Sequence, residues 1–227
     1  MLKSYVKRSG HFTDAQKKAY DRLSPEFLIP VVNENETTLI NDAGLDFNKI
    51  FNNRGDVIME IGFGSGIATS RIAKDNPDKN FLAIDVHKPG IGRLLWEIEK
   101  NNLINIRIIE YDAVIVASKM IKEGSLNAVH IFFPDPWPKK RHHKRRLVNK
   151  PFINVLARCL KTGGYIYMVT DWEDYASRAL EEMTLTDSLK NAYEGYAKRQ
   201  DWRPTTRFEK KGLDKNHVIR ELFFIKG

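Results

Sequence analysis

The chain has 227 residues, of which 42% are apolar and 29% charged, with a net charge of +8, and this composition excludes a disordered protein and a coiled coil. No stretch approaches the ~18 apolar residues of a membrane helix, and residues 1–18 contain no apolar segment typical of a signal peptide. The single cysteine, Cys159, excludes an internal disulfide and a cysteine-built zinc site, so we expect a cytoplasmic protein.

In chain order, a basic N-terminal segment, residues 1–30, precedes what we predict to be a single domain, residues 31–227. Within that domain, short runs rich in Val, Ile, Phe and Leu alternate with stretches long enough for a helix. These runs span residues 56–61, 80–85, 106–111, 127–133 and 165–170. The alternation predicts βαβ units on a parallel sheet whose strands are covered on both faces. A last run, residues 217–225, is expected to close the sheet as an antiparallel edge strand.

Two of the intervening stretches have the periodicity of amphipathic helices. In residues 91–98 and 152–159, apolar side chains recur at positions i, i+3, i+4 and i+7. The second helix is expected to begin near Pro151 and to end at Gly163 and Gly164. Cys159 falls on its apolar face, so we expect this cysteine in the core.

Each predicted parallel strand ends at or just before an acidic residue. These acids are Glu60, Asp85, Asp112, Asp135 and Asp171. In an open parallel sheet, ligands bind in the crevice beyond the carboxyl ends of the strands. One such acid alone is more often a helix cap than a ligand contact. Together, the five predict a pocket for a ligand that carries many hydrogen-bond donors and a positive charge.

A glycine-rich turn follows the first strand and supports the same interpretation. Gly62, Gly64 and Gly66 would let the backbone approach a ligand closely. The dinucleotide fingerprint G-x-G-x-x-G/A fails because Ile67 occupies its last position, and a ring of carboxylates would repel a pyrophosphate. A nicotinamide-dependent dehydrogenase is therefore disfavoured. S-adenosylmethionine suits the acids better, since it carries a sulfonium, an ammonium and donor groups but no phosphate.

The fourth strand runs into the sequence FFPDPW, residues 132–137. Prolines push the residues before them out of the helical region, so we expect an extended loop that presents Asp135 and the ring of Trp137. A carboxylate beside an aromatic plane can hold a flat heterocycle by its edge and its face. The alternative is a proline-stiffened turn in which Trp137 is part of the core.

Residues 139–146, KKRHHKRR, contribute six positive charges and two histidines with no acid. Such a run is usually a solvated face, but consecutive like charges repel one another unless a polyanion binds. We therefore predict that this loop contacts nucleic acid. The histidines of the chain show no ligand spacing with acids, and we predict no metal requirement.

The stretch FFPDPWPKKRHHKRR, residues 132–146, resembles the signature of the bacterial tRNA (guanine-N7-)-methyltransferases, which are class I S-adenosylmethionine-dependent enzymes. The resemblance extends to VKRSG (6–10), EIGFGSG (60–66), TDW (170–172) and TRFE (206–209), and so covers nearly the whole chain. It implies a Rossmann-like α/β fold with a mostly parallel seven-stranded sheet, an antiparallel edge strand and helices on both faces.

The resemblance also implies a set of site residues. S-adenosylmethionine contacts fall on Glu60, Asp85, Asp112 and Asp135, beside the turn formed by Gly62, Gly64 and Gly66. Substrate contacts fall on Lys139, Asp171, Thr206, Arg207, Phe208 and Glu209. RNA contacts fall on Arg141, His142, His143, Lys144, Arg145 and Arg146. Asp135 is the implied catalytic residue, and the family commonly has Glu where this chain has Asp85.

The implied reaction is methyl transfer to N7 of the guanine at position 46 in the variable loop of tRNA. Guanine N7 already carries an exposed lone pair, so catalysis is expected to be mainly alignment, with Asp135 orienting the base and stabilising its new positive charge. Methylation of an exocyclic base amine would favour an acid followed by two prolines and an aromatic residue, whereas one proline separates Asp135 from Trp137. A non-catalytic RNA-binding module is the other alternative. A monomer and a homodimer are both compatible with the sequence.

Overall fold

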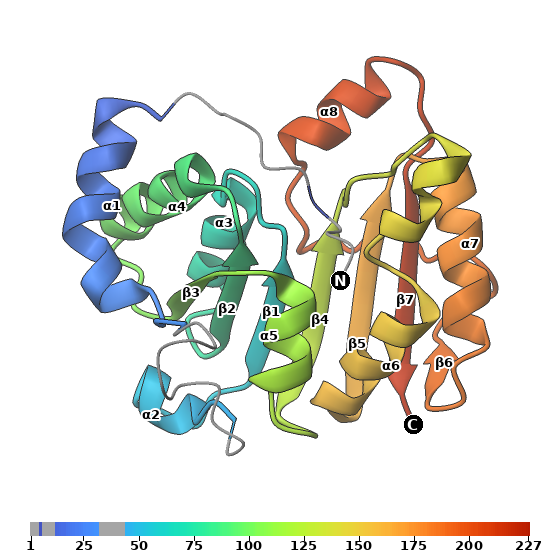
Figure 1. Ribbon diagram of the computed structural model, residues 1–227, viewed down its shortest axis with the longest axis horizontal. Coiled ribbons are helices and arrows are strands. Elements are labelled where there is room, and N and C mark those ends of the chain that lie inside the picture. Colours follow the sequence, from blue (N-terminus) through green and yellow to red (C-terminus); the bar gives the residue numbers. More distant parts are fainter. Residues whose placement is uncertain (1–4, 6–11, 32–43) are drawn as a thin grey trace.

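The computed structural model describes residues 5, 12–31 and 44–227, so the VKRSG stretch at residues 6–10 lies outside the described residues. A seven-stranded sheet occupies the middle of the molecule, with the strand order β3-β2-β1-β4-β5-β7-β6 (Figure 1). The strands are β1 (Val57–Ile61), β2 (Asn80–Asp85), β3 (Ile106–Glu110), β4 (Leu126–Phe132), β5 (Leu160–Thr170), β6 (Leu189–Asn191) and β7 (Arg220–Lys226). The five strands expected in parallel are all present and are paired in parallel.

The antiparallel end of the sheet is also present, but its order differs from the expectation. The arrow of β7 points the opposite way to that of β4, and β7 pairs in antiparallel fashion with β5 on one side and with β6 on the other (Figure 1). The outermost strand is therefore the three-residue β6, and the run at 217–225 lies one position inside the edge. Sequence patterning missed β6 because three residues are too few to show an alternation.

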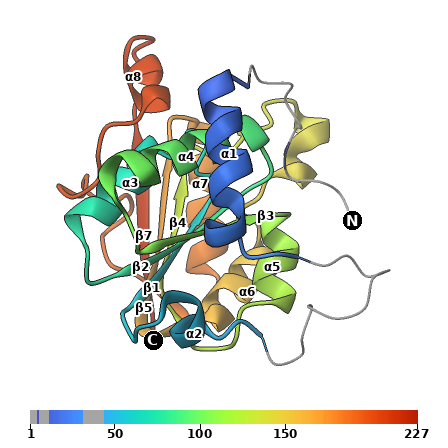
Figure 2. The same ribbon diagram turned by 90° about the vertical axis from the view of Figure 1, so that its left-hand side faces the viewer.

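Helices cover both faces of the sheet (Figures 1 and 2). Buried side chains of α1 (Asp14–Phe27), α3 (Ile67–Asp75) and α4 (Lys88–Asn101) pack on one face. Those of α2 (Phe47–Phe51), α5 (Ala113–Lys119), α6 (Lys150–Cys159) and α7 (Glu173–Thr184) pack on the other. Successive residues of β1 pack into the apolar cores on opposite faces of the sheet. Ile58 packs in the core beneath α1, α3 and α4, and Met59 packs in the core beneath α2, α5, α6 and α7. This explains why the parallel strands are apolar along their whole length.

Helix α6 begins as expected but ends earlier. Asn149 caps it by accepting a hydrogen bond from the backbone N–H of Phe152 at 3.2 Å, and the chain turns into extended conformation directly after Cys159. Cys159 is fully buried, as predicted. The glycines expected to end this helix lie instead within β5, where Gly163 has φ +80° beside an irregularity in the β4–β5 register. The described residues form no helix long and apolar enough to cross a membrane.

Candidate active site

The carboxyl ends of β1, β2, β4 and β5 lie along the edge of the sheet that is uppermost in Figure 1, where helix α8 (Arg207–Leu213) projects above them. Because parallel strands all end at the same edge, the acids that follow them are gathered there, as the sequence predicted. The structure also shows local contacts for several of these acids, and their roles differ from one acid to the next.

The glycine-rich turn has the left-handed backbone that its sequence requires. Gly62, Gly64 and Gly66 have φ of +72°, +60° and +67°. A Cβ added to Gly62 or Gly64 would meet no atom within 4 Å, whereas one on Gly66 would lie 2.6 Å from the Cβ of Leu94. Gly66 is therefore also needed for packing against α4, while the backbone at the other two glycines faces open space that a ligand can occupy.

Asp85 connects this turn to the end of β2. Its Oδ2 accepts a hydrogen bond from Gly64 N at 2.9 Å, and its Oδ1 accepts from Val86 N at 2.7 Å and His87 N at 3.0 Å. Burial raises the pKa of Asp85, while these three backbone donors lower it and so favour the ionised form. Asp85 thus fixes the shape of the turn, a role that spacing alone did not predict.

Glu60 is the next-to-last residue of β1, and only 3% of its surface is exposed. Burial raises the pKa of its carboxyl group to about 7, and the nearby negative charge of Asp85 adds to this effect. A cationic ligand at this edge of the sheet would lower the cost of ionising Glu60. The buried carboxyl group of Glu60 and the half-buried one of Asp85 are therefore suited to a positively charged ligand rather than to a phosphate.

Asp112 acts as the cap of α5, since its Oδ1 accepts a hydrogen bond from Val114 N at 2.8 Å. Burial raises the pKa of the Tyr5 hydroxyl, and the negative charge of Asp112 raises it further. The side chain of Tyr5 therefore lies near the end of β3. The structural role that an acid at a strand end usually has is thus present at Asp112. Its contact with a cofactor stays a prediction.

The loop that follows β4 has unusual backbone geometry. Phe133 and Trp137, on either side of Asp135, have φ of +51° and +45°, values that non-glycine residues adopt rarely. The indole of Trp137 is half-buried and lies outside both apolar cores, with the Arg145 guanidinium 5.0 Å from its centre and the His142 ring edge-on at 5.7 Å. The hypothesis that Trp137 is a core residue is therefore wrong, and the ring belongs to the basic run.

The basic run forms a short 3-10 helix, η1 (Lys140–Arg145), directly beside this loop. Four of its side chains are exposed: Lys139, Lys140, Arg141 and Lys144. Three others are half-buried: His142, His143 and Arg145. Arg146 is different, because only 2% of its side chain is exposed. The guanidinium of Arg146 is already paired within the protein, with the carboxylate of Asp174, so it differs from the exposed basic side chains around it, and its contact with RNA stays a prediction.

Asp171 and the C-terminal segment are brought together at the end of β5. Asp171 Oδ2 lies 3.0 Å from Nδ1 of His217, and a Cβ on Gly212 in α8 would lie 3.0 Å from the same oxygen. Helix α8 begins with a capping box, in which Thr206 and Glu209 bond to each other's backbone N–H groups. Phe208 is 56% exposed, and the side chain of Arg207 lies outside the described residues.

Glu209 is buried by an ionic network that the sequence did not reveal. Arg203, whose side chain has no exposed surface, donates two hydrogen bonds to Glu209 at 2.7 and 2.9 Å and one to Glu221 at 2.7 Å. Arg199 also pairs with Glu209, which is 2% exposed. The carboxylate of Glu209 is therefore enclosed by arginines and anchors α8, while its contact with substrate stays a prediction.

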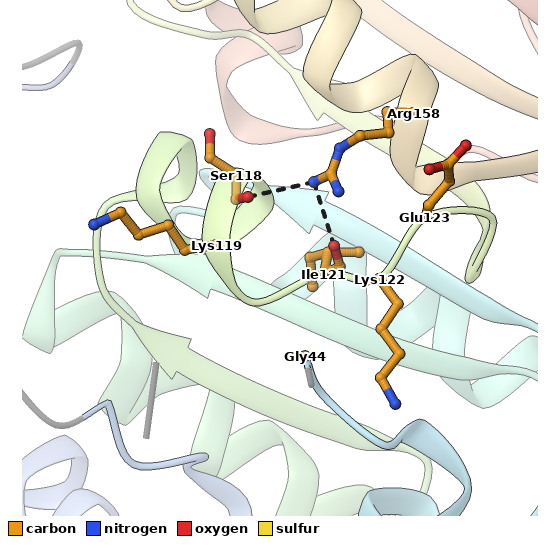
Figure 3. A pocket seen from close by; sticks show the side chains of 7 residues that line it. All are labelled: Gly44, Ser118, Lys119, Ile121, Lys122, Glu123 and Arg158. Atoms are coloured by element: carbon orange, nitrogen blue, oxygen red, sulfur yellow. Dashed lines mark hydrogen bonds between the residues drawn. The ribbon is translucent and has the colours of Figure 1, made fainter. Parts of the chain in front are cut away.

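A pocket of about 520 Å³ lies at the other end of α5 and does not include these residues. Figure 3 shows its lining side chains from Gly44, Ser118, Lys119, Ile121, Lys122, Glu123 and Arg158. The guanidinium of Arg158 donates to the carbonyl oxygens of Ala117, Ser118 and Ile121, and so caps the last turn of α5. This arginine has a structural role, and the pocket is separate from the gathered acids.

Comparison with known proteins gives consistent results. Residues 54–222 match a family model described as "Putative methyltransferase". The chain is 44% identical over 225 residues, 99% of its length and 96% of the relative's, to a tRNA (guanine-N(7)-)-methyltransferase of Nitrosomonas europaea. It is 48% identical over 223 residues, 98% of its length and 90% of the relative's, to the enzyme of the same name from Neisseria meningitidis serogroup A.

Solved structures resemble the fold at much lower identity. The 16S rRNA methyltransferase KamB superposes with a TM-score of 0.60 at 15% identity, covering 86% of this chain and 99% of that one. A 30S ribosomal A1408 methyltransferase from an uncultured bacterium superposes with a TM-score of 0.54 at 16% identity, covering 87% and 96%. These likenesses support the expected class I methyltransferase fold and carry no information on the base that is modified.

Proposed function

The chain belongs to the tRNA (guanine-N(7)-)-methyltransferase family, and from this premise we propose that it transfers a methyl group from S-adenosylmethionine to N7 of the guanine at position 46, in the variable loop of tRNA. Methylation of guanine N7 in tRNA is the activity of its relatives over nearly the full chain. The alternatives of exocyclic amine methylation and of a non-catalytic RNA-binding module are therefore set aside. The donor, the modified position and the site residues are the proposed parts.

The residues at the carboxyl edge of the sheet fit S-adenosylmethionine. The open backbone at Gly62 and Gly64 leaves room for a ligand. The carboxyl groups of Glu60 and Asp85 suit a molecule that carries positively charged groups. When bound, this donor would supply a methyl group on a positively charged sulfur. We propose that Glu60, Asp85, Asp112 and Asp135 hold it and that the backbone of the glycine turn packs against it.

Asp135 carries the proposed recognition of guanine. The observation that supports it is the loop itself, because two residues in left-handed conformation hold a carboxylate between the end of β4 and the exposed basic helix η1. The Asp135 carboxylate would accept hydrogen bonds from N1 and N2 of guanine and stabilise the positive charge that the ring gains. No proton leaves N7, so this role is alignment and electrostatic stabilisation rather than base catalysis.

The exposed basic residues complete the proposed substrate surface. Lys139, Lys140, Arg141 and Lys144 are next to the Asp135 loop and exposed to solvent, as phosphate contacts must be. Lys and Arg runs neutralise backbone phosphates without reading base sequence. We propose that this surface docks tRNA, while Asp171, Thr206 and Phe208 approach the target nucleotide from α8 and β5.

The decisive experiment uses the purified protein, unmodified tRNA transcripts and radiolabelled S-adenosylmethionine. We expect label in tRNA and reverse-transcription mapping of 7-methylguanosine to position 46. A transcript in which that guanine is replaced by adenine should accept no label. Label at another position, or on an exocyclic amine, would overturn the proposed target. Omitting every divalent ion and adding a chelator should leave the rate unchanged, which tests the predicted independence of metal.

A further inference from the structure

Arg146 ends the basic run, yet it points into the protein while its neighbours face solvent. Only 2% of its side chain is exposed, in contrast to Lys140, Arg141 and Lys144. Taking a guanidinium out of water is costly unless it is paired and hydrogen-bonded. The contacts that offset this cost therefore indicate what the residue does.

Those contacts connect the Asp135 loop to α7. The Nη2 of Arg146 donates to Asp174 Oδ2 at 2.5 Å, and its Nε donates to the carbonyl oxygen of Pro136 at 2.9 Å. The guanidinium also lies over the ring of Tyr175, 4.9 Å from its centre. Asp174 and Tyr175 are in the first turn of α7, and Tyr175 is fully buried in the sheet's core. Arg146 thus connects the Pro136 carbonyl to the first turn of α7, through the exposed Asp174 and the buried Tyr175, while its Nη1 has no hydrogen-bond partner among the described residues.

Pro136 directly follows Asp135, and this loop needs external support. Left-handed backbone at Phe133 and Trp137 costs free energy and persists only where the surroundings impose it. A proline at position 136 has no N–H, so its carbonyl oxygen is the polar backbone atom through which the chain can be held. The bond from Arg146 to that oxygen lies one residue from the carboxylate proposed to orient guanine.

We propose that Arg146 is a positioning residue for Asp135, which fixes the 133–137 loop against α7 and makes no contact with tRNA phosphate. The proposal rests on the proposed role of Asp135. It separates Arg146 from the rest of the basic run, where exposed Lys and Arg neutralise phosphates. Substituting a positioning residue should lower kcat and leave the salt dependence of tRNA binding unchanged. Substituting a phosphate contact should weaken tRNA binding and reduce its salt dependence.

The test compares Arg146→Met and Arg146→Lys with the wild type and with Lys144→Ala. Methionine keeps the apolar packing, and lysine keeps the charge but loses the planar fork that reaches Asp174 and Pro136 together. For both Arg146 variants we expect kcat to fall on the order of ten- to hundredfold, with an unchanged Kd for tRNA and an unchanged slope of log Kd against log salt. For Lys144→Ala we expect weaker tRNA binding and a flatter slope.

A single variant elsewhere on α7 provides the matched control. The side chain of Arg178 is 59% exposed and pairs with the partly buried Glu182, far from the Asp135 loop in sequence, so Arg178→Met should leave kcat and the salt slope unchanged. If Arg146→Met proves unstable in thermal melts, Arg146→Lys carries the test alone. A wild-type kcat in Arg146→Lys, or a flatter salt slope in either Arg146 variant, would overturn the proposal in favour of phosphate binding.

A double-mutant cycle then separates this proposal from the function on which it rests. If Arg146 acts through Asp135, Arg146→Met should reduce kcat much less in an Asp135→Asn background than in the wild type. Equal losses in both backgrounds would show that Arg146 does not act through Asp135. Total methyl incorporation measures these rates whichever base is modified, so a different target site would overturn the proposed function without affecting the cycle.

Discussion

Replacing Glu60 by Gln tests whether the buried carboxyl group at the end of β1 opposes folding at neutral pH. Burial raises its pKa from a usual value of 4.5 to about 7. Between these pH values the folded state holds the proton more tightly than the unfolded state, so stability falls as the pH rises and the loss is complete above about pH 7. One pKa unit corresponds to about 1.4 kcal/mol, so the full cost of ionising Glu60 is roughly 3 kcal/mol.

Glutamine resembles the protonated acid in shape and does not ionise. The two proteins should therefore be most alike in stability near pH 4.5, while at pH 8 Glu60→Gln should be the more stable by up to roughly 3 kcal/mol. The measurement is urea unfolding at half-unit steps of pH, with midpoints compared at constant m-value. The difference between the two proteins removes the contribution of titrating groups that do not interact with Glu60, and Asp85 is the neighbouring carboxyl group whose titration also changes.

An exposed acid provides the control for this series. Glu99 pairs with Arg22 at the surface, and Glu99→Gln should change stability little at any pH. A difference between wild type and Glu60→Gln that does not vary with pH would refute the argument, as would a variant less stable than the wild type at pH 8. S-adenosylmethionine at pH 8 should stabilise the wild type more than the variant, because a cationic ligand interacts with the ionised carboxyl group.

Three further results are expected. Asp135→Asn should lower turnover steeply while tRNA and donor affinities, measured separately, change little; a rate that rises with pH through a group lost in this variant would point to base catalysis instead. Replacing Lys140, Arg141 and Lys144 by Ala should flatten the slope of log tRNA affinity against log salt by somewhat under one unit per lost phosphate contact, and an unchanged slope would identify a merely solvated surface. Arg203→Ala should destabilise the fold by about 3–5 kcal/mol in urea unfolding, because it removes the arginine that Glu209 and Glu221 share in the interior and leaves Glu221 without a cationic partner in the described part of the chain, and a loss under about 1 kcal/mol would contradict the network.

The sequence by itself determined the five parallel strands and the edge of the sheet at which the candidate site lies. Continuous apolar runs predicted β1 to β5 because strands covered on both faces need no polar alternation. The acids at strand ends were found for a related reason: parallel strands end at one edge, so position along the chain translates directly into position in space. The glycine turn was equally local, since its left-handed backbone depends on the residues themselves.

Only the tertiary structure decided which charges are buried. Arg146 and Lys144 are indistinguishable within KKRHHKRR, but the carboxylate that pairs with the buried Arg146 is that of Asp174, 28 residues further along the chain. Likewise, TRFE gives no sign that Glu209 pairs with Arg203, which in turn reaches Glu221 on β7. A buried charge is stabilised by groups that folding brings to it from remote segments, and such pairing leaves no periodicity in the local sequence. For the same reason, patterning placed an antiparallel strand at the end of the sheet but could not show that β6 lies outside it.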